Sequence, residues 1–172
     1  MRAPIQIRVP NLPAARKLFD KVREFGADPT ELLDIWGALL EASTRRRFDT
    51  GQGPGGVPWP PSIRAKLEGG KTLVDKGNLE SSLRYAVRPN ELEVGVDGVG
   101  ASSKFAFVHQ FGAHIVPREA KALRFPLPGG GFAVVSSVDI PARPFLGIDE
   151  DDKADMKETG GDYLRSLIDG GP

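Results

Sequence analysis

The feature that most constrains this chain is a Gly/Pro-rich segment at residues 49–61. Glycine and proline make up 21 and 15 of the 172 residues, and they gather in clusters of this kind. Glycine favours irregular backbone and proline removes a hydrogen-bond donor, so this segment is not expected to form regular structure. Trp59 lies between prolines within it, which indicates a loop anchored against another part of the protein. We therefore expect ordered elements joined by long loops.

Two amphipathic helices are predicted before this segment. Apolar residues recur at helical spacing over residues 11–25, where Asn11 is placed to cap the helix. A second helix follows a capping-box pattern that begins at Asp28, and it is expected to end near Phe48.

Beyond the segment, short helices and strand pairs alternate. Helical spacing predicts helices over residues 62–67, 78–83, 104–111 and 149–169. Period-two alternation predicts one hairpin over 84–97 and another over 123–140, the latter turned by Gly129–Gly131. The pair Gly160-Gly161 is expected to break or kink the last helix.

These elements define an α+β fold with an N-terminal helical pair, a central antiparallel β-sheet of about four strands and a C-terminal helix. The length suits one domain over residues 1–172. Its expected parts are a helical part, the Gly/Pro loop, an α+β core, and a C-terminal helix and tail: residues 1–48, 49–61, 62–148 and 149–172.

Composition narrows the function. Basic and acidic residues number 23 each, so the formal net charge is zero, which allows self-association and argues against a dedicated nucleic-acid binder. Cysteine is absent, which excludes disulfides, thiolate metal sites and cysteine nucleophiles. No apolar run reaches the length of a membrane span, so we expect no membrane partner.

The patterns that could carry chemistry are better explained without it. Gly51, Gly53 and Gly56 match a dinucleotide fingerprint, but a helix precedes them and prolines follow, so helix-end N–H groups cannot face a phosphate. His109 and His114 are separated by residues expected to end their helix, so a hydrogen-bonded histidine at a helix end is preferred over a metal ligand.

Catalysis is likewise not expected. The serines lack the context of an activated nucleophile, and the acidic run at residues 149–152 suits the positive end of a helix dipole. We therefore expect no enzyme activity, no cofactor and no metal. Arg45, Arg46 and Arg47 suit the negative end of their helix, and the alternative is contact with DNA phosphates or an acidic partner.

A short segment near the C-terminal helix is more specific. Residues 140–147 read IPARPFLG. Pro141 and Pro144 fix their own φ angles and favour extended backbone before them. Arg143 is thus expected on a stiff arm, with its guanidinium available to carboxylates or carbonyl oxygens, and Phe145 is expected to pack or dock.

This segment and residues 105–112 (FAFVHQFG) together resemble the phage virion morphogenesis family, the tail-completion proteins of Mu-like and related tailed phages. The resemblance includes residues 56–60 and 73–82, and it runs in the family's order from about residue 30 to 148. The signature residues that it implies, interpreted as packing and interface residues, are Trp59, His109, Gln110, Phe111, Gly112, Pro141, Arg143, Pro144 and Phe145.

The resemblance implies a structural role at the head–tail junction, or neck, of the virion, after assembly in the bacterial host cytoplasm. It implies a homo-oligomeric ring, expected to be a hexamer, between the capsid connector and the tail. The expected partners are head connector or stopper proteins, tail tube or tail terminator proteins, and genome DNA in the channel.

Two alternatives stay open. One is a tail terminator that caps the tail tube, and the other is a DNA-binding module that uses Arg45, Arg46 and Arg47. Within the neck interpretation, the Gly/Pro loop and the segment at residues 141–145 are expected to supply one ring surface. Replacing Arg143 and Phe145 with alanine is then expected to leave a folded subunit that cannot join tails to heads.

Overall fold

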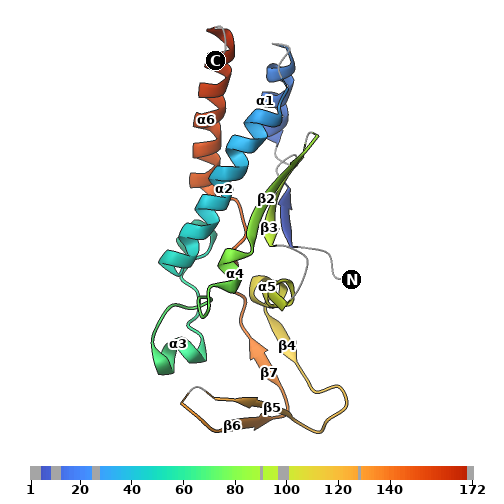
Figure 1. The fold of residues 1–172 in the computed structure, drawn as a ribbon, viewed down its shortest axis with the longest axis vertical. Helices are drawn as coiled ribbons and strands as arrows, with labels where there is room; N and C mark the ends of the chain where they lie inside the picture. The colour runs from blue at the N-terminus through green and yellow to red at the C-terminus, as the bar shows by residue number, and fades with distance from the viewer. Residues whose placement is uncertain are drawn as a thin grey trace.

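We describe a computed structural model of the chain, for residues 5–8, 13–24, 28–89, 91–96, 101–127 and 129–169. The molecule is elongated (Figure 1). One half, the helical half, holds helices α1 (Pro13–Glu24), α2 (Thr30–Thr50) and α6 (Glu150–Ile168) beside strands β1 (Gln6–Arg8), β2 (Leu83–Arg88) and β3 (Glu91–Val96).

The other half, the distal half, is built from short elements (Figure 1). It holds α3 (Ile63–Glu68), α5 (Ala101–Phe111), β4 (Ala113–Ile115), β5 (Leu123–Pro126), β6 (Phe132–Val135) and β7 (Val138–Ile140). The short helix α4 (Asn78–Ser81) lies where the two halves meet (Figure 1). The α+β class predicted from the sequence is confirmed.

Among the described residues, the strands form three small antiparallel sheets, in the orders β1-β3-β2, β4-β7 and β5-β6. The expectation of one central sheet of about four strands was therefore wrong in its arrangement. The predicted return strand over 132–140 divides at Ser136 and Ser137, and its two parts take different partners: Phe132–Val135 pairs with β5, and Val138–Ile140 pairs with β4. The hairpin β2-β3 was predicted, whereas β1 was not.

The Gly/Pro segment is largely irregular, as predicted, but it is ordered by contacts. Helix α2 continues two residues past Phe48, and a 3-10 turn forms at Pro54–Gly56. A single β-bridge joins Gln52 to Pro58. Trp59 is buried, which confirms that the loop is anchored.

Two apolar clusters form the core. The first joins α1, α2, β3 and α6 around Trp36, whose indole N–H donates to the backbone oxygen of Met156 at 3.0 Å. The second lies at the end of α2, where Phe48 contacts Trp59 and Phe145, with ring centroids 5.5 Å apart in both pairs. The second cluster thus connects the Gly/Pro loop to the segment before α6.

The two glycines near the end of the chain do not interrupt their helix, so the expected break was wrong. Helix α6 runs unbroken through both. A Cβ atom at Gly160 would lie 2.5 Å from Leu18 Cδ2 and 3.2 Å from the Trp36 ring. Gly160 therefore lies where α6 packs closely against α1 and α2, and this packing needs the absence of a side chain.

This contact gives a test of the helical packing. Gly160→Ala should lower the free energy of unfolding by about 1–3 kcal/mol, because the added methyl group overpacks a buried contact. Gly161→Ala is the matched control, since nothing lies within 4 Å of a Cβ there. The control should be neutral or stabilising by up to about 1 kcal/mol through helix propensity. Urea denaturation measures both, and equal effects would contradict the packing described.

Candidate functional site

The segment at residues 141–149, here called the arm, connects β7 to α6 without regular secondary structure. Three parts of the protein hold it in place. They are the end of α2, the Gly/Pro loop and the end of α5. The arm carries four of the nine signature residues predicted from the sequence, so its surroundings decide what those four residues can do.

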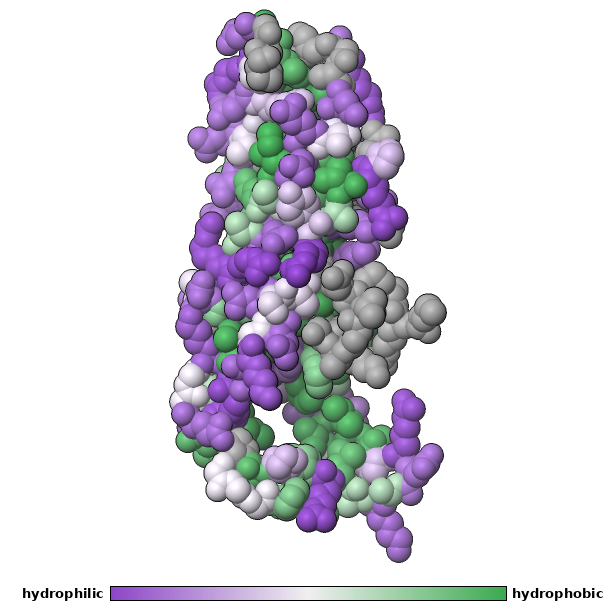
Figure 2. Space-filling view, in the orientation of Figure 1, coloured by the Kyte–Doolittle hydropathy of each residue, from purple (hydrophilic) through white to green (hydrophobic). Residues whose placement is uncertain are grey.

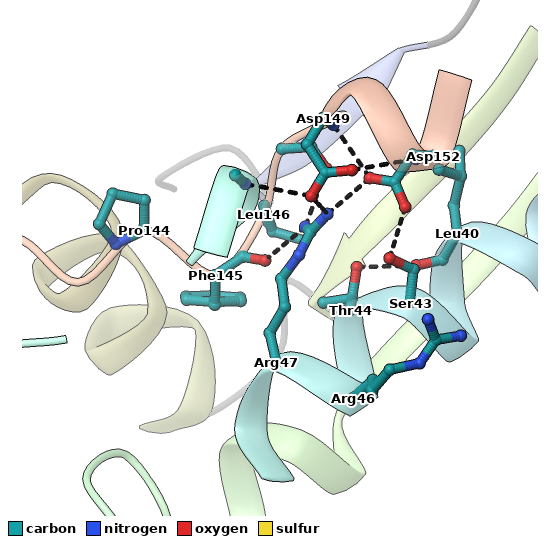
Figure 3. Close-up of polar contacts among 12 residues, drawn as sticks. Leu40, Ser43, Thr44, Arg46, Arg47, Pro144, Phe145, Leu146, Asp149 and Asp152 are labelled. Carbon is teal, nitrogen blue, oxygen red and sulfur yellow. Dashed lines mark hydrogen bonds and ion pairs between the residues drawn. The ribbon is translucent and has the colours of Figure 1, made fainter. Parts of the chain in front are cut away.

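Arg47 on α2 makes the central contact (Figure 3). One guanidinium nitrogen donates to the carbonyl oxygens of Phe145 at 3.1 Å and Gly147 at 2.9 Å. The other lies 3.1 Å from a carboxylate oxygen of Asp149 and 2.5 Å from one of Asp152. The Arg47 side chain is only 7% exposed, so this pairing takes place largely out of water.

The two carboxylates also cap α6. The side chain of Asp149 accepts from the N–H of Asp152, and the side chain of Asp152 accepts from the N–H of Asp149, which is a reciprocal capping box. Asp149 further accepts from the N–H of Gly55 in the Gly/Pro loop at 3.1 Å. Burial alone would oppose ionisation, but the N–H donors of Asp152 and Gly55 and the charge of Arg47 lower the pKa of Asp149.

Gln110 holds the arm from the side of α5. Its amide nitrogen donates to the carbonyl oxygen of Leu146 at 2.8 Å. Its amide oxygen accepts from the N–H groups of Phe145 at 3.1 Å and Leu146 at 3.0 Å. A side-chain amide thus pairs with the backbone of an extended segment as a neighbouring strand would.

The arm presents its most specific side chains to the interior, not outward. Arg143 is 5% exposed and its Nε donates to the carbonyl oxygen of Pro60 at 2.6 Å, while Phe145 is fully buried. The indole N–H of Trp59 donates to the carbonyl oxygen of Pro144 at 2.8 Å. The expectation that Arg143 and Phe145 reach a neighbouring subunit is corrected, because prolines stiffen a backbone without fixing which side faces inward. Their double alanine variant should unfold the subunit.

The two histidines have separate environments. The Nδ1 atom of His109 is buried and has no hydrogen-bond partner among the described residues, so the expected hydrogen-bonded histidine was wrong for this atom. Burial, followed by the nearby charge of Arg143, lowers the pKa of His109. His114 lies beyond the end of α5 on β4, where its Nδ1 is 2.6 Å from an Asp139 carboxylate oxygen. Among the described residues, no three potential ligands gather as a metal site would require.

The three consecutive arginines of α2 have different roles, which corrects their joint assignment to DNA or an acidic partner. Arg47 is occupied within the protein, as described. Arg45 pairs with Glu41 at 2.9 Å and donates to the carbonyl oxygens of Glu80 and Leu83. Only Arg46 is exposed. Of these three arginines, only Arg46 is therefore available to contact DNA.

The remaining signature residues lie on or beside the surface of the distal half. Phe111 is 61% exposed, and Pro141 and Pro144 are exposed as well. Gly112 adopts a φ of +75°, and a Cβ there would lie 2.9 Å from the carbonyl oxygen of Ile140. Gly112 therefore lets the end of α5 lie against the start of the arm, which brings β4 beside β7.

Exposed apolar side chains gather on this half of the protein, on a surface here called the distal surface (Figure 2). Its exposed apolar side chains come from α5, β4, β6 and the chain that follows β4. They are Phe105, Phe107, Phe111, Ile115, Val116, Phe132 and Val134. Sequence reasoning named Phe111 as a packing or interface residue, but it did not group Phe111 with the other exposed apolar side chains, which come from separate elements of the chain. Among the described residues, no helix is both long and apolar enough to span a membrane.

The comparison with known proteins agrees with these motifs. The sequence pattern of the phage virion morphogenesis family matches residues 11–165, and the chain belongs to this family of bacteriophage virion proteins. It is similar to Mu-like prophage FluMu G protein 2 of Haemophilus influenzae, with 29% identity over 164 residues that cover 95% of this chain and 99% of that protein. No solved structure matches the chain.

The Arg47 contacts can be tested by substitution. Arg47→Ala should lower the free energy of unfolding by about 3–5 kcal/mol, because it leaves the buried carboxylate of Asp152 without its charged partner. The adjacent Arg46→Ala is the matched control and should change it by less than about 0.5 kcal/mol, since Arg46 is exposed. Thermal or urea denaturation measures the difference. Losses of similar size would show that Arg47 does not hold the arm.

Proposed function

We propose that the chain is a structural, non-catalytic subunit of the head–tail junction of a tailed phage. In this proposal, copies of the chain form a ring that completes the tail and joins it to the capsid connector. Membership of the virion morphogenesis family supports a role in building the particle. The distal surface is the structural observation that supports the proposal, because a subunit of a larger assembly presents exposed apolar side chains to its neighbours.

The distal surface is poorly suited to permanent contact with water. Phe105 and Phe111 on α5 are 59% and 61% exposed, and Phe132 and Val134 on β6 are 58% and 65% exposed. Large exposed apolar patches mark interaction sites on soluble proteins. Within the described part of the chain, the sheets β4-β7 and β5-β6 each have two strands, and the outer edge of a two-stranded sheet offers backbone groups to a neighbouring chain.

The charge balance also supports assembly. The chain has 23 basic and 23 acidic residues, so copies do not repel one another through net charge. The DNA-binding alternative is weakened, because Arg47 and Arg45 are occupied within the protein. The tail terminator alternative would use the same surfaces and differs in where the ring sits.

The role in the particle can be tested by omitting the protein. Phages that lack the chain should produce filled heads and separate tails of normal length, as seen by electron microscopy. Tails of irregular length would instead indicate a terminator, because an uncapped tube has no fixed end. Normal virions would contradict both roles.

The distal surface can be tested by substitution. The double variant Phe105→Ser and Phe111→Ser should fold normally, because both side chains are exposed. It should lose roughly 30-fold or more in assembly affinity, since exposed aromatic anchors dominate such contacts. Complementation of the deleted phage measures this effect as particle yield. Ile35→Ser on α2, where Ile35 is 37% exposed, is the control and should leave the yield unchanged.

A further inference from the structure

A groove in the helical half combines an apolar floor with a rim of positive charge. It lies between α1 and α6, has a volume of about 580 Å³, and is floored by Leu18, Trp36, Met156 and Leu164. In Figure 2 patches of apolar atoms lie among hydrophilic atoms in this half of the molecule. Four side chains of the lining, here called the groove lysines, are Lys17, Lys21, Lys153 and Lys157.

The groove lysines are arranged unfavourably for an isolated subunit. Lys17 and Lys21 are four residues apart on α1, and Lys153 and Lys157 are four residues apart on α6, so each pair lies along one helix face. Like charges at this spacing repel each other, and the two pairs also face a common groove. Lys153 pairs with Glu150 at 2.6 Å, but among the described residues no ion pair reaches the other three. Negative charge brought into the groove would relieve this repulsion.

The opposite side of α6 carries the complementary charge. Four exposed carboxylates, here called the acidic stripe, are Asp151, Asp155, Glu158 and Asp162. Asp155 is two positions from both Lys153 and Lys157, roughly 200° around the helix, so the stripe faces away from the groove. Asp162 pairs with Arg165 on its own helix, whereas within the described part of the chain no ion pair involves the other three.

The spacing of the two charge sets agrees. Members of the acidic stripe follow one another at intervals of four, three and four residues, and each groove pair is separated by four residues. An interval of four residues is a rise of about 6 Å in either helix. Carboxylates of one copy can therefore meet successive groove lysines of another, with Ala154 and the aliphatic stem of Glu158 over the apolar floor.

We propose that the groove between α1 and α6 binds the acidic stripe of α6 from a second copy of this chain. The contact rests on the ring in the proposed function and gives that ring its lateral interface. A closed ring needs two different surfaces on one subunit that meet after rotation, and the groove and the stripe lie on opposite sides of α6. The groove is therefore occupied by helix α6 of a second copy, and the contact is heterologous because it joins two different surfaces of the subunit.

Charge reversal tests this contact. The groove variant carries Lys17→Glu, Lys21→Glu and Lys157→Glu, and the stripe variant carries Asp151→Lys, Asp155→Lys and Glu158→Lys. Each alone should weaken self-association by about 100-fold at low ionic strength, because attraction is lost and repulsion replaces it. An equimolar mixture of the two should recover oligomers. The reversed groove of one variant then meets the reversed stripe of the other, and the native stripe of the first variant meets the native groove of the second. Analytical ultracentrifugation at high protein concentration measures all three samples.

A matched control separates this effect from net charge. Lys66→Glu, Lys76→Glu and Lys121→Glu change the charge by the same amount at exposed positions outside the groove. This control variant should associate like the unaltered chain, whose self-association should also weaken as salt screens the ion pairs.

Three results would overturn the proposed contact. Oligomers that survive both reversals would show that copies meet elsewhere, which leaves the proposed function standing. A groove variant that self-associates normally but fails to complement the deleted phage would assign the groove to another virion protein. An unaltered chain that stays monomeric would exclude the contact, and the particle assay would still decide the proposed function independently.

Discussion

The ion pair between Arg47 and the two aspartates at the start of α6 determines the arrangement of the remaining parts. It joins the end of α2 to the N-terminus of α6, and the same guanidinium binds the carbonyl oxygens of Phe145 and Gly147. The apolar cluster around Phe48 and Phe145 forms beside these contacts. Because one partner alone would be a buried uncompensated charge, the arm, the Gly/Pro loop and α6 depend on the complete set.

This arrangement divides the signature residues into two groups. Trp59, Gln110, Arg143 and Phe145 act within the subunit, since they fix the arm between α5 and α2. Phe111 lies on the distal surface, where a neighbouring protein of the virion could contact it. A motif that resembles a binding element is therefore largely the internal scaffold that supports an apolar surface beside it.

The sequence predicted the local elements well and their partners poorly. Periodicity located α2, α5 and α6, but a local rule for glycine could not anticipate that Leu18 and Trp36 would pack against Gly160. Helical phase did hold a signal for Arg47, which follows buried Thr44 by three positions and buried Leu40 by seven. Local sequence patterns could not predict its pairing with Asp149 and Asp152, because over 100 residues separate Arg47 from both.

Amide hydrogen exchange tests most directly whether the arm is an internal part of the subunit. The N–H groups of Arg143, Phe145 and Leu146 donate to groups of α5 within the same chain. They should therefore be protected in the free protein and change little in assembled particles, whereas amides near the distal surface should gain protection on assembly. Rapid exchange of the arm amides in the free protein, with protection only in particles, would contradict this account. It would show that the arm forms a contact with a neighbouring protein.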